Sequence, residues 1–492
     1  MEFGECMRQI MQHRQCSILQ LQRKMRLKSA TSISRILRNE CSYSVALSFY
    51  NQLSLTNFLM LQKDEKQQLE EALEIKRLGR DVYEAYRTLE QLYAAPPMDD
   101  EAAPLTYYTA EGASLVSLGA WAREMAGCKG IKGYIFNNCS YPFFRSMMRL
   151  FSALPQEAFS LTHYFDISAS PMSIVTPLVC LVYTLRIDNY EGLYQVIPND
   201  GANGCPSSYR NKAYIWATGT DGSETVYTLH MTRDQRLFLR KAPDDGSMRN
   251  MLKGLLDSED FRNCIPIRRK TMSSNLHNDL ISLYQRLLYM EKNRGQRILW
   301  QSLCVSFIPP GTLLRMASAV PAFAREESRE VVEALAGLHA ERHRHIYEKK
   351  QSTHMVLSKG AMRKFAQEGY LQDHPHGFPP LTSEDRVEIL EALLQQCKVN
   401  PYFHVYMGRD GFPPAGISYM SFSDLGLYVY DSDTDYSLDR PMYEAFISVD
   451  ELGKLFDSFF DNVVLVKYVD NETESIAFLG SLLCELKGNS GP

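Results

Sequence analysis

The feature that most constrains the fold of this chain is a change of pattern at one alanine- and proline-rich stretch. "AAPPMDDEAAP" runs from Ala94 to Pro104 and is typical of a linker between folded segments. Before it, apolar residues recur every three or four positions, which is the period of a helix. After it, short runs of β-branched and aromatic residues alternate with helical patterns. The 492 residues therefore predict several domains, with a helical front and a larger body that contains strands.

The front of the chain predicts a small bundle of five helices. Each of the first four is expected from an apolar stripe, and a fifth is expected around Leu55 to Leu61. Ser17 and Gln20 form a capping box before the second stripe, and Ser29 is a favourable N-cap for the third. The four stripes are Phe3, Met7, Ile10 and Met11; Ile18, Leu21 and Met25; Ile33, Ile36 and Leu37; and Val45, Ala46, Phe49, Tyr50 and Leu53.

The third of these helices has an unusual outer face. Opposite its apolar stripe lie Thr31, Arg35 and Arg38, with no acid before Glu40. Arginine can bind both acceptors of a guanine, and hydroxyl groups suit phosphates. Residues 1–62 hold eight basic and three acidic side chains, so their net charge is 8 − 3 = +5, and the rest of the chain carries −5 − 5 = −10. This charge asymmetry indicates that the front contacts a polyanion.

Residues 3–53 resemble a Cro/lambda-repressor (XRE-type) helix-turn-helix domain. The resemblance rests on "SILQLQRKM", "RLKSAT" and "SISRIL", although the turn of that family usually has a glycine where this chain has Arg26. It implies a five-helix bundle whose third helix contacts double-stranded DNA, usually in a homodimer. By position, the implied DNA contacts are Lys28, Ser29, Thr31, Ser32, Ser34, Arg35 and Arg38. A helical protein-interaction module of the same shape is the alternative interpretation.

The fold class expected for the whole chain is multidomain. An all-α five-helix helix-turn-helix bundle is followed by a helical linker and then by a large α/β or α+β body. One long helix is expected from Asp64 to Tyr93, whereas "IVTPLVCLVYTL" and "LWQSLCVSFIP" are interpreted as buried strands, and no internal repeat is evident. The expected domains are 1–62 for the DNA-binding bundle, 63–104 for the linker, 105–270 for an α/β sensor-like domain, 271–400 for a mainly helical segment and 401–492 for an α+β segment.

Motifs that carry chemistry are scarce. The chain has no glycine-rich phosphate loop, no H-E-x-x-H and no G-x-S-x-G. His339 and His343 are four residues apart, but no third ligand has matching spacing, so a solvated helix face is expected. "DSDTD" (431–435) lacks the glycine and the final acid of a calcium loop, and "HPHGFPP" (374–380) predicts a stiff loop. The sequence thus predicts no catalytic residue, metal or cofactor, and it identifies no cofactor-binding residue.

The function predicted from these features is that of a cytoplasmic, sequence-specific DNA-binding transcriptional regulator without enzyme activity. Its body would sense a small-molecule, peptide or protein effector. Eleven scattered cysteines indicate reduced thiols, and the apolar stretch 167–185 contains prolines and hydroxyls that disfavour a membrane span. Two alternatives remain open, namely a nucleic-acid-acting enzyme delivered by the helix-turn-helix domain and a protein-interaction scaffold. Convergent acids or histidines in the body would favour the enzyme.

Overall fold

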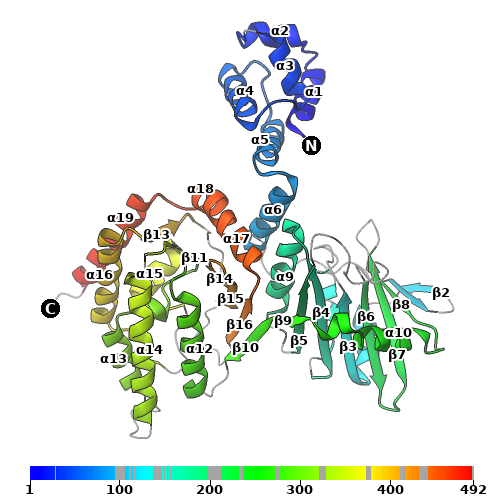
Figure 1. Ribbon diagram of the computed structural model, residues 1–492, viewed down its shortest axis with the longest axis vertical. Helices are drawn as coiled ribbons and strands as arrows, with labels where there is room; N and C mark the ends of the chain where they lie inside the picture. The colour runs from blue at the N-terminus through cyan, green and yellow to red at the C-terminus, as the bar shows by residue number, and fades with distance from the viewer. Residues whose placement is uncertain are drawn as a thin grey trace. The chain divides into compact units, whose positions relative to one another are not determined.

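The computed structural model divides the chain into two compact units, Met1–Thr88 and Leu89–Pro492 (Figure 1). Several segments named above lie outside the described residues. They are residues 95–104 of the expected linker, most of "DSDTD" and most of "HPHGFPP", and Lys28 is also outside. The structure describes residues 1–27, 29–94, 106–109, 112–115, 118–136, 144, 147–148, 150–151, 153–155, 157–185, 187, 189–197, 212–231, 237–272, 276–320, 328–348, 350–372, 378–410, 412, 416–431 and 442–489.

The first unit is built from short helices, and the four that the apolar stripes predict are present. They are α1 (Phe3–His13), α2 (Ile18–Lys24), α3 (Ala30–Leu37) and α4 (Tyr43–Thr56). The capping box at Ser17 and the N-cap at Ser29 are confirmed. The helix expected around Leu55 to Leu61 is wrong, because α4 continues to Thr56 and Asn57 ends it in the left-handed conformation (φ 47°). The next helix, α5, occupies Lys63–Leu78.

Helix α5 contributes to the core of the first unit. Its Leu69 and Leu73 are buried in the same apolar cluster as the residues of the four stripes. At the start of α5, Glu65 lies 2.6 Å from Nη2 of Arg14, which follows α1. The single helix expected from Asp64 to Tyr93 is wrong. Gly79, with φ +84°, separates α5 from α6 (Arg80–Ala94), a conformation that only glycine adopts without strain.

The second unit contains two mixed sheets, which confirms the expected body of strands and helices in this coarse form. The strand order is β2-β1-β8-β7-β6-β3-β4-β5-β9 in the nine-stranded sheet and β10-β16-β15-β14-β11-β12-β13 in the seven-stranded sheet. The antiparallel meander expected from "KAYIWATG" to "RLFLRKA" is confirmed as β6, β7 and β8. The strands of the first sheet are β1 (Thr106–Thr109), β2 (Gly112–Leu115), β3 (Cys128–Phe136), β4 (Phe159–Ile167), β5 (Tyr190–Val196), β6 (Lys212–Gly219), β7 (Glu224–Met231), β8 (Leu237–Lys241) and β9 (Ile265–Pro266). Those of the second sheet are β10 (Arg268–Met272), β11 (Gln296–Leu299), β12 (Thr353–Ser358), β13 (Phe403–Gly408), β14 (Ile417–Phe422), β15 (Gly426–Asp431) and β16 (Met442–Ile447).

The two sheets repeat one topology, although no internal repeat is evident in the sequence. In the first sheet, β3, β4 and β5 are parallel neighbours, β6 pairs antiparallel with β3, and β7 and β8 follow outward. In the second sheet, β11 to β16 take the same places in the same chain order. A helix follows the last strand of each set, α10 (Ser247–Leu256) after β8 and α17 (Asp450–Phe459) after β16. The body is therefore an internal duplication at the level of the fold.

Helices pack on one face of the seven-stranded sheet and form a large apolar cluster with it (Figure 1). Among the strand residues buried there are Met355, Leu357, Val405 and Met407. The helices of the second unit, beyond α10 and α17, are α7 (Leu118–Ala126), α9 (Pro171–Thr184), α11 (Glu259–Arg262), α12 (Leu276–Glu291), the 3₁₀ turn η1 (Val305–Phe307), α13 (Pro310–Ser318), α14 (Arg329–Glu348), α15 (Lys359–Glu368), α16 (Ser383–Val399), the π-helical turn η3 (Phe460–Val464), α18 (Leu465–Lys467) and α19 (Glu472–Asn489).

Two strands expected from sequence are wrong. "IVTPLVCLVYTL" forms most of α9, in which nine of 14 residues are buried, so the polar stripe that marks a surface helix is missing. Pro171 at its first turn suits a helix start. In "LWQSLCVSFIP", β11 ends at Leu299 and a 3₁₀ turn follows at Val305. In the part of the chain that the structure describes, no helix has both the length and the apolar character needed to cross a membrane.

Candidate active site

Four polar residues lie in line across the seven-stranded sheet. Backbone pairing sets Ser421 opposite Arg297, Arg297 opposite His354, and His354 opposite His404. Residues that pair in register point to the same face, and their chain neighbours point to the other. Ile298, Met355 and Val405 therefore point into the apolar cluster described above. The four polar residues, which we call the polar row, point to the opposite face, on which α17 packs.

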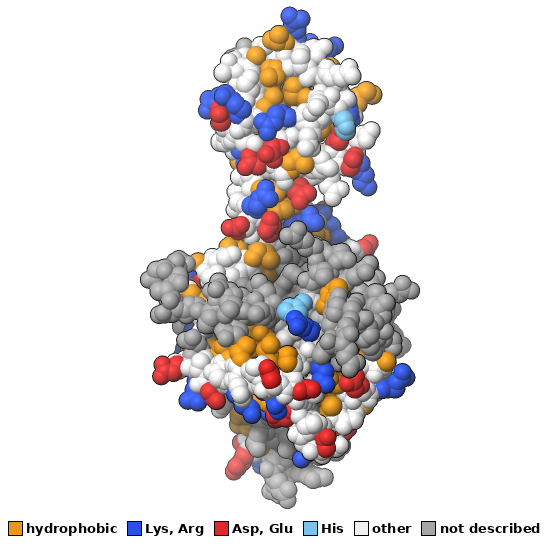
Figure 2. All heavy atoms as spheres, turned by 90° about the vertical axis from the view of Figure 1, so that its right-hand side faces the viewer, with side chains coloured by type: hydrophobic (Ala, Val, Ile, Leu, Met, Phe, Trp, Pro, Cys, Tyr) orange, Lys and Arg blue, Asp and Glu red, His pale blue; other side chains and the backbone are white. Residues whose placement is uncertain are grey.

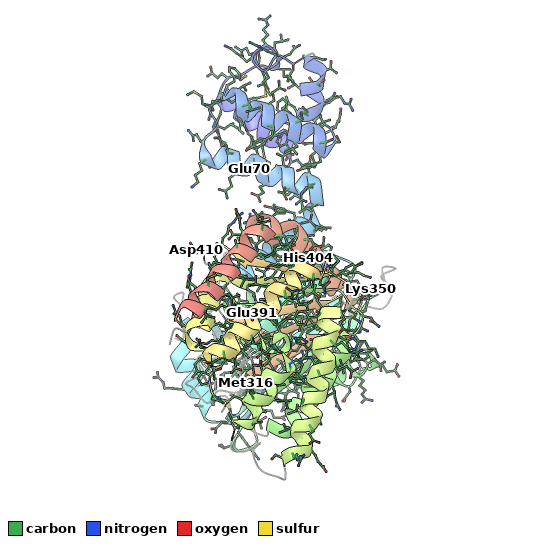
Figure 3. The ribbon with its side chains drawn as sticks, turned by 90° about the vertical axis from the view of Figure 1, so that its left-hand side faces the viewer. Glu70, Met316, Lys350, Glu391, His404 and Asp410 are labelled. Atoms are coloured by element: carbon green, nitrogen blue, oxygen red, sulfur yellow. The ribbon has the colours of Figure 1, made fainter. Side chains whose placement is uncertain are left out.

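The two histidines of the polar row stack on each other and are each held by a neighbour. Their ring centroids are 4.5 Å apart, with 22° between the ring planes. Nδ1 of His404, which is labelled in Figure 3, lies 3.0 Å from Oε1 of Glu472 at the start of α19. Because a carboxylate accepts, Nδ1 of His404 is the protonated nitrogen, and Nε2 carries the lone pair of the neutral ring. The hydroxyl of Tyr406 lies 3.3 Å from Nδ1 of His354.

The environment keeps His354 neutral. Burial lowers the pKa of His354 to about 4, and the nearby charges of Arg297 and His404 act in the same direction. Burial raises the pKa of Tyr406 to about 12, with Glu472 and Asp461 adding to the effect. A protonated Tyr406 therefore donates to Nδ1 of His354, whose proton must then sit on Nε2. The site combines one neutral histidine with one that a carboxylate orients.

Two aspartates from the helix that follows β16 lie over the other end of the polar row. Asp461 in η3 accepts from Arg297 at two positions, with Nε to Oδ1 at 2.8 Å and Nη2 to Oδ2 at 3.0 Å. Asp457 in α17 accepts from the hydroxyls of Ser421 and Ser423. Burial raises the pKa of Asp457 above its usual range. A π-helical turn such as η3 frequently marks a functional site.

The site opens toward solvent at its carboxylates. The side chains of Arg297 and His404 are 16% and 24% exposed, whereas those of Glu472 and Asp461 are 38% and 44% exposed. A ligand can therefore reach the polar row past carboxylates that are already hydrated. Acids, histidines, a tyrosine and an arginine at one place are the groups that acid–base and group-transfer chemistry uses.

The corresponding face of the nine-stranded sheet is apolar where α10 covers it. There, Tyr134, Phe136 and Trp216 pack against Leu252 and Leu255 of α10. Helix α10 takes the position in this half that α17 takes in the other half. The two halves therefore differ in the sheet side chains that α10 and α17 contact. Only the second half places a histidine pair on this face within the residues that the structure describes.

The residues that the sequence assigned to DNA contact mostly lie on the outer side of α3. Thr31, Ser32, Arg35 and Arg38 are exposed, and Ser29 and Ser34 are half-buried. The remaining one, Lys28, lies outside the described residues. Figure 2 shows lysine and arginine side chains spread over the visible surface of this unit.

Several of these side chains have local partners. Oγ of Ser29 accepts from the backbone of Thr31 at 3.1 Å, and Oγ of Ser34 donates to the carbonyl of Ala30 at 3.2 Å. Nη2 of Arg38 lies 3.3 Å from Oε2 of Glu40. Ser29 and Ser34 therefore stabilise α3 itself. Arg35 donates to the carbonyl of Glu40 at 3.4 Å, so both arginines have exposed local partners that a ligand would replace.

The turn between α2 and α3 contains a residue in the left-handed conformation. Arg26, in the position where that family usually has glycine, adopts φ 52° in the left-handed region.

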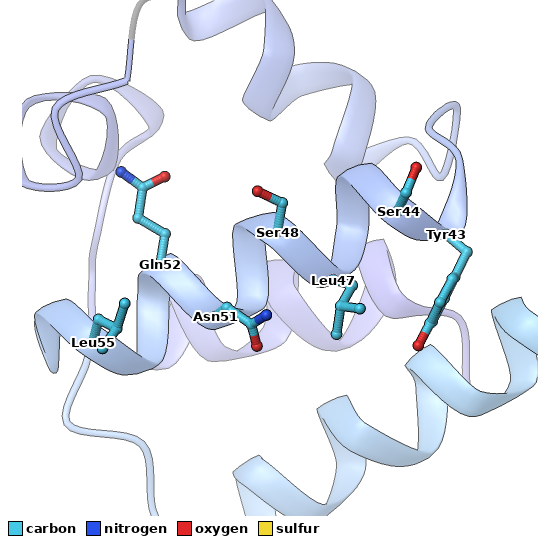
Figure 4. Close-up of a pocket in the computed structure, with 7 residues that line it drawn as sticks. All are labelled: Tyr43, Ser44, Leu47, Ser48, Asn51, Gln52 and Leu55. Carbon is cyan, nitrogen blue, oxygen red and sulfur yellow. The ribbon is translucent and has the colours of Figure 1, made fainter.

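A shallow groove on the first unit carries no charged side chain (Figure 4). It has a volume of about 480 Å³ and runs along α4. Gln52 in this groove donates to the carbonyl of Met25 at 2.6 Å, and Leu55 is 86% exposed. Its lining residues are Tyr43, Ser44, Leu47, Ser48, Asn51, Gln52 and Leu55. Such a lining has no histidine, acid or basic side chain.

The solvated face expected around His339 and His343 is wrong. His339 is buried, and its Nε2 lies 2.9 Å from the carbonyl of Ile308. Arg342 is also buried and pairs with Glu291. Helix α14 therefore turns this side inward. Across the described ranges, no three His, Cys, Asp or Glu side chains gather where they could hold a metal ion.

Comparison with known proteins gives a limited result. No protein-family model matches the chain, and no curated protein matches it. Among solved structures, the chain is similar to the phosphatidylserine synthase of Haemophilus influenzae Rd KW20, with a TM-score of 0.27 and 10% identity over 82% of this chain and 96% of that chain. It is also similar to the polyphosphate kinase of Porphyromonas gingivalis, with a TM-score of 0.20 and 10% identity over 76% of this chain and 53% of that chain.

These comparisons contradict the function predicted from sequence. Both similar structures are enzymes, and neither is a DNA-binding transcriptional regulator. They contradict the predicted regulator without enzyme activity, but they do not test the helix-turn-helix resemblance of residues 3–53. At these TM-scores, neither structure informs the reaction or the substrate of this chain. The reaction and the substrate must therefore be inferred from the polar row. None of its residues belongs to a motif that the sequence predicts.

Proposed function

We propose that this protein is an enzyme that acts on nucleic acid. Its catalytic centre is the polar row, and its first unit holds the nucleic acid. The observation that carries the proposal is the arrangement of His404, which Glu472 orients through Nδ1 and which stacks on the neutral His354. Convergent histidines and acids in the body are the feature that favours an enzyme over a binding protein.

The arrangement suits His404 as a general base. A carboxylate at Nδ1 fixes the tautomer of the ring and stabilises the imidazolium that forms when Nε2 takes a proton. In the proposed hydrolysis of a phosphodiester, the oxygen of a water bonds to phosphorus as its proton passes to Nε2 of His404. The bond from phosphorus to the sugar oxygen breaks, and that oxygen takes a proton from solvent. His404 then returns its proton to solvent.

The first unit supports nucleic acid as the substrate. Residues 1–62 carry a net charge of 8 − 3 = +5 on a chain whose total is −5. Thr31, Ser32, Arg35 and Arg38 lie on the outer side of α3 as a helix-turn-helix domain would present them. We propose that this face binds double-stranded DNA mainly through phosphates, and that two copies of the chain associate as the resemblance implies. Binding of this kind weakens steeply with salt.

The test of the reaction uses the full-length protein and end-labelled single- and double-stranded DNA and RNA, with products separated on a denaturing gel. We expect cleavage of at least one substrate, reduced about 100-fold or more in His404→Gln and about 10-fold or more in Glu472→Gln. Glu333→Gln is the matched control, because Glu333 is exposed on α14 and pairs only with Arg329 among the ion pairs of the described residues. Absence of cleavage, or equal cleavage by His404→Gln and the parent protein, would overturn the proposal.

The test of nucleic-acid binding is separate from turnover. Arg35→Ala combined with Arg38→Ala should lower the affinity for duplex DNA and reduce the slope of log K against log salt by about 2, one for each phosphate that an arginine no longer neutralises. Fluorescence anisotropy at several salt concentrations measures both quantities. An unchanged slope would place the nucleic acid elsewhere on the chain.

A further inference from the structure

We infer that Arg297 is the anion-binding residue of the polar row and that Asp461 occupies it until a substrate phosphate takes its place. The inference deepens the proposed function and rests on it for the identity of the anion. Its starting point is the paired contact between the two side chains, in which two nitrogens of the guanidinium meet two oxygens of one carboxylate at 2.8 and 3.0 Å.

The geometry of this pair is one that a phosphate reproduces. Guanidinium presents its N–H groups as a rigid fork, and both carboxylate and phosphate offer two oxygens that fit it. Asp461 therefore occupies the fork as a phosphate would. A phosphodiester carries one negative charge, as a carboxylate does, and its two free oxygens can accept the same two hydrogen bonds from Arg297.

Arg297 lies at the place where a bound phosphate would be useful. It is the direct neighbour of His354 in the row, and His354 is the direct neighbour of His404. Neighbouring strands are about 4.8 Å apart, so the backbones at Arg297 and His404 are about 10 Å apart. A nucleic acid bound at Arg297 would thus have its next backbone groups near the general base.

The exposure of the two partners favours exchange. Arg297 is 16% exposed and Asp461 is 44% exposed. A buried guanidinium needs an anion, because an unpaired buried charge is costly. Asp461, by contrast, is already partly hydrated and loses little when it turns to water. The cation is therefore fixed in the sheet, and its partner is the exchangeable part.

Two other arginine pairs among the described residues of the same half lack this asymmetry. Glu444, the partner of Arg286, is 3% exposed, and Glu291, the partner of Arg342, is 2% exposed. A carboxylate so buried cannot leave its arginine without an uncompensated charge. Those pairs stabilise the fold, whereas in the Arg297–Asp461 pair the carboxylate of Asp461 is exposed to solvent.

The experiment measures binding of inorganic phosphate and of a short single-stranded oligonucleotide to the full-length protein by calorimetry at low salt. We expect Asp461→Asn to bind both ligands about 5-fold more tightly, since one competing ion pair is removed. Arg297→Lys keeps the charge and loses the fork, so it should bind both about 10-fold more weakly. The double variant Arg297→Lys/Asp461→Asn should lose most of the gain that Asp461→Asn shows alone. Glu333→Gln is again the control and should match the parent.

The outcomes separate this inference from the proposed reaction. Weaker binding in Asp461→Asn would mean that Asp461 positions Arg297 for the ligand, and it would overturn the inference. Equal binding in all variants would overturn it as well, because Arg297 would then not touch the anion. Tighter phosphate binding in Asp461→Asn without any cleavage of nucleic acid would support the anion site and overturn the proposed reaction. Thermal unfolding of each variant excludes loss of fold as the cause of a change.

Discussion

The ion pair between Arg342 and Glu291 offers the sharpest test of how the second half of the body is held together. It joins α14 to the end of α12, and both side chains are 2% exposed. Nε and Nη2 of Arg342 lie 2.9 and 2.8 Å from the two oxygens of Glu291. Ser306 accepts a further hydrogen bond, and the ring centroid of Tyr284 lies 4.7 Å from the guanidinium carbon. Both charges of the pair are therefore engaged inside the protein.

The size of the effect follows from burial. Arg342→Met leaves the charge of Glu291 buried without its partner, which should lower the free energy of unfolding by about 3–5 kcal/mol. Arg342→Met combined with Glu291→Leu removes both charges and fills the volume with apolar groups. That double variant should lie within about 1 kcal/mol of the parent protein, because the desolvation cost of the pair disappears together with its attraction.

The measurement is urea unfolding followed by the fluorescence of Trp300. Trp300 is 3% exposed and belongs to the apolar cluster that α12 and α14 help to form. The chain has three tryptophans, so a background with Trp121→Phe and Trp216→Phe isolates the signal of this half. Arg329→Met with Glu333→Leu is the matched control on the same helix, where the side chains are 76% and 67% exposed, and it should change stability by less than about 0.5 kcal/mol. A loss below about 1 kcal/mol in Arg342→Met, or a double variant no more stable than the single one, would refute the argument.

Two further predictions concern pH and backbone. Burial lowers the pKa of His339 to about 3. Below pH 6.5, His339 therefore binds a proton in the unfolded chain but not in the folded chain. His339 alone should lower the free energy of unfolding by about 1.4 kcal/mol per pH unit from pH 6.5 toward 4. Urea midpoints at pH 7 and 5 should show that His339→Gln is less sensitive to pH than the parent protein. Gly426 has φ +140°, and a Cβ there would lie 2.1 Å from the carbonyl oxygen of Ile447, so Gly426→Ala should cost more than about 2 kcal/mol. Gly337→Ala on α14, where a Cβ meets nothing within 4 Å, should instead stabilise by about 0.5–1 kcal/mol in thermal scans, and the opposite order would contradict the backbone argument.

The helices of the first unit could be predicted because each buries only one side. A stripe such as Ile33, Ile36 and Leu37 appears in the sequence at the helical period, and Ser29 supplies a cap at its start. The two errors in this region concern where helices end. Gly79 interrupts a stripe that continues across it, since the apolar period alone does not show a break of one residue. Asn57 ends α4 through its left-handed backbone, which a propensity scale does not reveal.

Helix α9 was interpreted as a strand because burial on all sides removes periodicity. Its Ile174, Leu178 and Leu181 are buried, and so are most of the residues between them. A continuous apolar run of this kind is compatible with a buried strand as well as with a buried helix. The quoted run has 12 residues, which exceeds the length of an ordinary strand, and together with Pro171 it favours a helix.

The candidate site could not be predicted because its residues meet only through strand register. Arg297, His354 and His404 are separated by about fifty residues each along the chain, and Glu472 lies further still. No short sequence motif contains these residues, whereas site residues on a single turn or loop would form a motif that the sequence reveals. The sequence does carry one weak signal. "HMVLS" and "HVYMG" each place a histidine in a strand between buried residues, which is an uncommon position for a polar side chain unless a partner is present.

The duplicated topology explains why one half of the body carries the site. The helix after the last strand lies over the same face in each half, and its side chains must match those of the sheet beneath it. Leu252 and Leu255 of α10 match an aromatic face and bury it. Asp457 in α17 and Asp461 in η3 instead meet Ser421 and Arg297, so this face keeps its polar groups and its access to water. A charged row under a helix such as α10 would be left without partners and would be too costly to bury. The chemistry of the second half therefore depends on the helix as much as on the strands, and exchange of the two aspartates for leucines should abolish catalysis without any change to the histidines.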